Sequence, residues 1–261
     1  MKPSRLTRRC DQVGEYRIFS RCSNTAPENS LPLVLVHGLS VSSAYMIPLA
    51  EALAPDFPVF APDLPGHGNS VKPERALNLQ ELAAALSAWM DVLAIPAAVM
   101  VGNSMGCQII LELAHARRAG VRGAVFIAPP RAPRARGALA LLWRGARNML
   151  PEPVTLIPVL LRDYFAAGLW RTFRTLRMAQ QEPVRERLAR MPAPTLVVRG
   201  EHDTIAPQRW VEEAARLLPE GKLVVLPGAA HAANFDASHA LAAVVRNWIE
   251  GYSASHGPER V

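Results

Sequence analysis

The stretch Gly102-Asn103-Ser104-Met105-Gly106 follows the apolar run 97–101 and precedes residues with helical spacing. A serine hydroxyl becomes a strong nucleophile only where the chain presents it and a base removes its proton. A sharp turn from strand to helix presents the serine in a strained backbone conformation, and the flanking glycines let strand and helix pass closely. In this context the five residues predict that Ser104 is a nucleophile.

An aspartate and a histidine follow two later runs that read as strands. The run 195–199 leads into Asp203, and the run 223–226 leads into His231 through a glycine turn. All three side chains then lie past the C-terminal ends of predicted strands, the edge where ligands bind in open α/β sheets. The pattern therefore predicts His231 as a general base and Asp203 as the acid that orients it, with Glu201 as the fallback acid.

Two earlier segments carry further motifs. Residues 33–39 read as a strand followed by His37-Gly38-Leu39, and residues 63–70 follow the pattern D-x-P-G-x-G-x-S. With these motifs and the chain order Ser, Asp, His, the sequence resembles the α/β-hydrolase superfamily from about residue 31 to 252. The resemblance implies that the backbone N–H groups of Leu39 and Met105 form an oxyanion hole. It gives residues 63–70 a structural role and no chemistry.

Strand-like and helix-like segments alternate along most of the chain. This alternation predicts a doubly wound, mostly parallel sheet, the α/β-hydrolase fold. The expected strands cover residues 13–22, 33–36, 58–61, 97–101, 124–127, 195–199 and 223–226, and the expected helices cover 42–54, 79–93, 104–119 and 238–251. Cys107, one turn into the third of these helices, is expected to be a small buried thiol.

The alternation lapses between residues 129 and 191, where apolar residues recur at helical spacing among several prolines. The resemblance implies that this insertion is a helical cap over the active site. The expected organisation is a core in two parts, 1–128 and 192–252, with the cap at 129–191 and a frayed polar tail at 253–261. We expect the aromatic residues of the cap to pack inside it and its arginines to face water, because an unpaired buried charge is costly.

The charge and the cysteines restrict the function classes. The net charge is +7, and residues 131–190 hold twelve arginines against four acids. This clustering, without interleaved aromatic residues for base stacking, argues against nucleic acid, although weak contact of the arginine-rich cap with anionic partners is expected. No secretory signal and no transmembrane segment are evident. Three cysteines without metal-type spacing favour a reducing compartment, so the cytoplasm is the expected location.

The predicted function is a carboxylesterase-like serine hydrolase that cleaves a small, uncharged ester through an acyl-enzyme on Ser104. The expected substrate is a small-molecule ester, and no metal or cofactor is expected. The residues Asn103 to Gly106 also resemble the turn of hydrolases that break C–C bonds in meta-cleavage products, but Ala232 stands where those enzymes typically have tryptophan. An acyl-carrier thioesterase that docks an acidic carrier on the cap, and a non-catalytic ligand receptor, remain alternatives.

Overall fold

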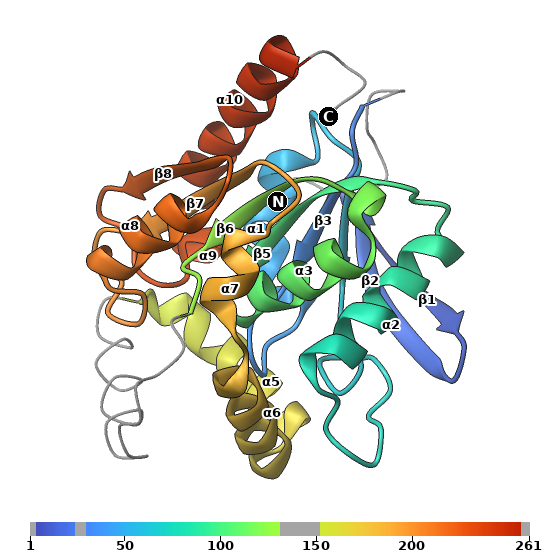
Figure 1. Cartoon of the computed structure of the whole chain (residues 1–261). Helices are drawn as coiled ribbons and strands as arrows, with labels where there is room; N and C mark the ends of the chain where they lie inside the picture. Colours follow the sequence, from blue (N-terminus) through green and yellow to red (C-terminus); the bar gives the residue numbers. More distant parts are fainter. Residues whose placement is uncertain (1–3, 24–29, 131–151, 257–261) are drawn as a thin grey trace.

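The structure is a computed structural model that describes residues 4–23, 30–130 and 152–256 (Figure 1). The expectations for about the first third of the insertion fall on residues 131–151 and lie outside the described residues. No helix in the described part of the chain is both long and apolar enough to cross a bilayer.

The described strands form one sheet in the order β1-β2-β4-β3-β5-β6-β7-β8. The pairs β1–β2 and β2–β4 are antiparallel, and all other neighbouring strands are parallel. The predicted doubly wound, mostly parallel sheet is therefore confirmed. The strands are β1 (Leu6–Val13), β2 (Tyr16–Ser23), β3 (Leu33–Val36), β4 (Val59–Pro62), β5 (Ala98–Asn103), β6 (Val121–Ile127), β7 (Thr195–Gly200) and β8 (Gly221–Leu226).

Helices cover both faces of the sheet (Figure 1). Helix α1 packs with α10 on one face, and α2 packs with α3 on the other. Local signals fix several helix starts: Asn78 and Glu81 form a capping box at α2, and Ser42 caps α1. The helices are α1 (Ser43–Leu53), α2 (Leu79–Val92), α3 (Met105–Ala116), α5 (Ile157–Ala167), α6 (Leu169–Gln181), α7 (Val184–Ala189), α8 (Gln208–Leu217), α9 (Ala233–Asp236) and α10 (Ser238–His256), with short 3-10 turns η1 (Arg118–Gly120) and η2 (Val154–Leu156).

The N-terminal strands differ from the prediction. The sequence predicts one strand over 13–22, whereas the structure has the hairpin β1–β2, in which Val13 pairs with Tyr16 across a two-residue turn. Gly14 adopts φ 55° in that turn, a conformation that glycine reaches without strain. The sequence does not predict β1, because this edge strand consists mostly of exposed polar residues and lacks apolar alternation.

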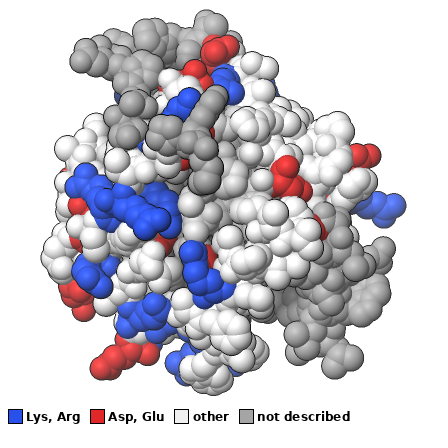
Figure 2. Space-filling view, turned by 180° about the vertical axis from the view of Figure 1, so that it is seen from behind, with Lys and Arg blue, Asp and Glu red and all other residues white. Residues whose placement is uncertain are grey.

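Helices α5, α6 and α7 form the described part of the insertion between β6 and β7. The expected packing of aromatic side chains inside the insertion is wrong for α5 and α6, where Phe165 is 83% exposed and Trp170 67%. Basic side chains lie beside a largely white surface at the lower end of the molecule, where these helices project (Figures 1 and 2). At the other end of the chain, α10 continues to His256, into the expected tail.

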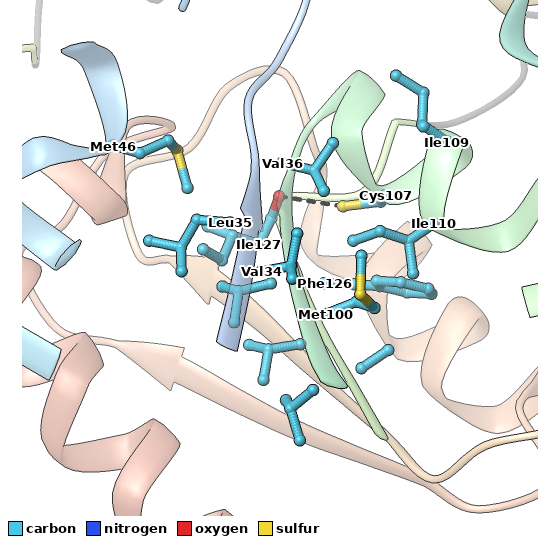
Figure 3. Packing of buried hydrophobic residues seen from close by; sticks show 14 of the residues in the cluster. Val34, Leu35, Val36, Met46, Met100, Cys107, Ile109, Ile110, Phe126 and Ile127 are labelled. Carbon is cyan, nitrogen blue, oxygen red and sulfur yellow. Dashed lines mark hydrogen bonds between the residues drawn. The ribbon is translucent and has the colours of Figure 1, made fainter. Parts of the chain in front are cut away.

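The core lies between the sheet and its helices (Figure 3). Every residue of β3 and β5 is buried, as expected for parallel strands that are covered on both faces. Cys107 is buried among these residues, and its thiol donates to the carbonyl oxygens of Gly102 (3.2 Å) and Ile127 (3.5 Å). Burial raises the pKa of this thiol, and the structure confirms the expected small buried thiol.

Candidate active site

The candidate site lies where the direction of strand addition reverses. From β3 the chain proceeds to β4 on one side and then crosses to β5 on the other, so β3 and β5 are neighbours at a switch point. Ligands bind at such points in open α/β sheets, beyond the carboxyl ends of the strands. Val36 pairs with Gly102, and the loops that follow the two strands are in contact. A Cβ built on Gly38 would lie 3.5 Å from the Cβ of Ser104.

Ser104 occupies a strained turn between β5 and α3. Its backbone has φ 52° and ψ −118°, which a residue with a side chain rarely adopts. The two flanking glycines make this turn possible. A Cβ on Gly106 would lie 2.3 Å from the carbonyl oxygen of Val36, and one on Gly102 would lie 2.7 Å from the carbonyl carbon of Gly106. The structure thus confirms the sharp strand-to-helix turn.

The structure brings Asp203 and His231 together. The Nδ1–H of His231 donates to Oδ2 of Asp203 at 3.0 Å, and both side chains are buried. The other carboxylate oxygen of Asp203 accepts from the backbone N–H groups of Ile205 (2.7 Å) and Ala206 (2.9 Å). These bonds fix the tautomer and the orientation of the imidazole, which leaves Nε2 as the nitrogen able to accept a proton.

The pKa values of this pair shift in opposite directions. Burial works to raise the pKa of Asp203, but the charge and hydrogen bond of His231 and the two backbone N–H groups outweigh it and lower the pKa. Burial also works to lower the pKa of His231, but the Asp203 carboxylate outweighs it and leaves the pKa above its ordinary value. Near neutral pH Asp203 is therefore ionised, and its carboxylate stabilises the imidazolium that forms when His231 accepts a proton.

Asn103, the residue before Ser104, is hydrogen-bonded to the backbone of His231. The amide of Asn103 donates to the carbonyl oxygen of His231 at 3.2 Å, which ties the end of β5 to the loop after β8. Among the described residues the structure gives the Ser104 hydroxyl no hydrogen bond, so a bond from Ser104 to His231 remains a prediction.

The loop that holds Leu39 is fixed by His37. Its Nε2 accepts from the Leu64 N–H at 3.1 Å, so Nδ1 carries the proton and donates to the Gly38 carbonyl at 2.8 Å. Burial lowers the pKa of His37, which keeps the ring neutral. Met105 is the first residue of α3, so its N–H has no acceptor within the helix and lies at the positive end of the helix dipole.

Sequence reasoning missed a role for Arg199. This arginine is only 9% exposed and donates to three backbone carbonyls of the following loop: Ala206 (2.9 Å), Glu201 (3.0 Å) and Asp203 (2.8 Å). It therefore holds the loop that carries the acid. The only signal in the sequence is an arginine at the end of the apolar run 195–199, where a charge needs buried partners.

The insertion contacts the loops around the site. The Ser40 and Thr172 hydroxyls are 2.6 Å apart, and Ser42 donates to Asp163 at 2.6 Å. Near His231, the N–H of Ala232 donates to Glu152 at 3.1 Å. These bonds join the insertion to the segments after β3 and β8.

Comparisons with known proteins agree with this architecture. A model described as the alpha/beta hydrolase family matches residues 33–245. The acetyltransferase component of an acetoin cleaving system from Pseudomonas putida, a dihydrolipoyllysine-residue acetyltransferase, is 31% identical over 81% of this chain, which spans only 61% of that relative's length. A pimeloyl-[acyl-carrier protein] methyl ester esterase from Xanthomonas campestris is 30% identical over 77% of this chain and 87% of its own length.

Among solved structures, a membrane phospholipase A of bacterial origin aligns with 95% of this chain and 87% of its own, with a TM-score of 0.81. At 21% identity this likeness concerns the fold alone.

Proposed function

The chain belongs to the α/β-hydrolase family, and from this premise we propose that it hydrolyses a small, uncharged carboxylic ester through an acyl-enzyme on Ser104. The observation that carries the proposal is the buried hydrogen bond between His231 and Asp203, next to the strained turn at Ser104. The family's enzymes include esterases such as the Xanthomonas relative.

The proposed reaction has two halves. His231 takes the proton of Ser104 at Nε2 while the serine oxygen attacks the acyl carbonyl, and Asp203 stabilises the imidazolium that forms. The N–H groups of Leu39 and Met105 donate to the oxyanion. The tetrahedral intermediate collapses when His231 gives its proton to the leaving alcohol. A water molecule, activated by His231, then attacks the acyl-enzyme and releases the acid.

We infer that the insertion acts as a cap and that the acyl pocket is uncharged. Four of the seven arginines described on the insertion have partners away from the catalytic residues, which supports this inference. Arg162 pairs with Asp163, Arg185 pairs with Glu213, and Arg187 pairs with Glu112. Arg171 donates to the backbone carbonyls of residues 73 and 75. The cytoplasm remains the expected compartment, and all three cysteines are free thiols.

Active-site labelling tests the nucleophile. We expect the protein to hydrolyse short p-nitrophenyl esters and to react with a fluorophosphonate, with the adduct on Ser104 by mass spectrometry. Ser104→Ala abolishes both, whereas Ser87→Ala, which removes a hydroxyl on α2, leaves both intact. Equal labelling of the Ser104→Ala variant would remove the proposal and favour a different nucleophile. A wild-type chain that binds esters without turnover would favour the receptor alternative.

A substrate panel tests the bond and the charge. Matched neutral esters, carboxylate-bearing esters, acyl thioesters and dienol-type ketones are compared by kcat/KM. We expect the neutral esters to be the best substrates. A hundredfold preference for ketones would support C–C cleavage, and one for thioesters would support the thioesterase alternative. A hundredfold preference for carboxylate-bearing esters over neutral esters would contradict the inference that the acyl pocket is uncharged.

A further inference from the structure

The exposed apolar side chains of this molecule gather on one segment. Among the described residues nine large apolar side chains are exposed, and seven of them lie between residues 154 and 173. We define the α5–α6 patch as Leu161 (55% exposed), Phe165 (83%), Leu169 (82%), Trp170 (67%) and Phe173 (52%). Soluble proteins rarely leave an apolar surface of this kind uncovered unless it binds something.

The charged side chains that are exposed on helices α5 and α6 are basic. Helices α5 and α6 contain four arginines and one acid, Asp163, which is buried and bonded to Arg162 and Ser42. The guanidinium of Arg174 lies over the ring of Trp170, 5.0 Å from its centroid, and Arg177 is exposed one turn further along α6. The patch therefore presents aromatic and aliphatic side chains with positive charge, without an exposed carboxylate from either helix.

The other side of this helix pair is tied to the core. Asp163 accepts from Ser42, and Thr172 contacts Ser40. Arg171 donates to the carbonyl oxygen of Arg75 at 2.9 Å. These bonds determine which side of α5 and α6 faces outward. The helices that carry the patch are therefore also the helices that contact the segment after Leu39.

We propose that the α5–α6 patch docks the protein on the surface of a bilayer that contains anionic phospholipids. Aromatic side chains favour the boundary between headgroups and acyl chains, and arginine pairs with lipid phosphate. The two helices project from the lower end of the molecule (Figure 1), so the side chains exposed on them can reach the flat surface of a bilayer. The net charge of +7 adds attraction to such a surface.

Vesicle flotation of the full chain tests the proposal. We expect the protein to float with vesicles of phosphatidylcholine and phosphatidylglycerol, to float poorly with phosphatidylcholine alone, and to be released by high salt. The double variant Arg174→Gln and Arg177→Gln should bind the anionic vesicles about thirtyfold more weakly, since each arginine near such a surface contributes about a factor of five. The double variant Phe165→Gln and Leu169→Gln should lose about tenfold or more.

The matched control removes one exposed apolar side chain and one arginine elsewhere, with Val92→Gln on α2 and Arg209→Gln on α8. It should bind vesicles like the wild type, and all variants should hydrolyse a water-soluble ester at the wild-type rate. Failure of the wild type to float, or equal loss in the control variant, would overturn the proposal. A dimer that Phe165→Gln dissociates, with no flotation, would instead assign the patch to a second copy of the chain.

A second readout uses Trp170 itself. Brominated phosphatidylglycerol should quench part of the wild-type tryptophan fluorescence, and Trp170→Phe should abolish that quenching while the other four tryptophans remain. Quenching that survives in Trp170→Phe would place the contact elsewhere and overturn the assignment of the patch.

Discussion

The hydrogen bond from His231 to Asp203 sets the pH range of the proposed reaction. The carboxylate holds the pKa of His231 above the ordinary value of 6.5 against the opposing effect of burial. We expect wild-type kcat/KM to rise through an apparent pKa above 6.5 and then level off. Asp203→Asn removes the charge that opposes burial, and burial is the largest effect on the pKa of His231. The midpoint of the kcat/KM profile should therefore fall below 6.5, with a loss of kcat of about 10⁴-fold.

Rates on a p-nitrophenyl ester, measured across pH, check this prediction. Asp56→Asn, which removes a surface aspartate paired with Arg246, is the control and should keep the wild-type profile. Identical midpoints for the wild type and Asp203→Asn would contradict the role of the carboxylate.

Arg199 is a positioning residue, because it holds the loop that carries Asp203. In Arg199→Met three backbone carbonyls lose a charged donor, so we expect the free energy of unfolding to fall by about 2–4 kcal/mol. Because Asp203 belongs to the same loop, the midpoint of the pH profile should also move toward lower pH, and Arg199→Lys should restore part of both effects. Urea unfolding and kcat/KM profiles measure them. A loss of stability with an unchanged pH midpoint would leave Arg199 a purely structural role.

At the scale of secondary-structure elements, Gly200 controls the position of His231. A Cβ on Gly200 would lie 2.1 Å from the carbonyl oxygen of Ala230 and 2.5 Å from that of Ala229. The end of β7 therefore touches the loop that carries His231, and Gly200→Ala must displace that loop. Since a displacement of about 1 Å costs on the order of a hundredfold in rate, we expect that loss in kcat with the fold retained by circular dichroism.

Gly251→Ala is the control, because a Cβ at Gly251 in α10 meets nothing within 4 Å. This change should leave kcat unchanged and stabilise the helix by up to ~1 kcal/mol. Full activity of Gly200→Ala would contradict the contact between the two segments.

The sequence predicts the elements that carry continuous apolar patterns and not those that depend on tertiary surroundings. The buried strands β3, β5 and β7 and the turn at Ser104 follow from local residues, because each lies in the core or at a strand end. The edge strand β1 and the exposed face of α5 and α6 do not follow from local residues, because the polarity of a residue alone does not determine whether other parts of the protein cover it. The role of Arg199 is likewise invisible, since its acceptors are backbone atoms brought together only by folding.

At the scale of the whole molecule, the core and the insertion meet at a pH-sensitive contact. Glu112 on α3 is buried, pairs with Arg187 of α7 at 2.5 Å, and lies near Glu182 and Gln80. Burial raises the pKa of Glu112 to about 7, and the charge of Glu182 adds to this effect against the pull of Arg187. The folded protein therefore binds a proton that the unfolded chain, with a glutamate pKa near 4.5, has released.

Stability from this proton is fully present below pH 4.5 and is lost as the pH rises through about 7. Glu112→Gln cannot titrate, so the difference in free energy of unfolding between wild type and variant should change by about 1–2 kcal/mol over that range, less than the full shift implies because Arg187 and solvent screen the charge. Urea unfolding at a series of pH values measures it, with Glu213→Gln, whose partner is Arg185, as control. Parallel profiles for wild type and Glu112→Gln would mean that folding does not raise the pKa of Glu112. The contact between α3 and the insertion would then be an ordinary ion pair, and the helix that begins beside Ser104 would hold the insertion equally well at every pH.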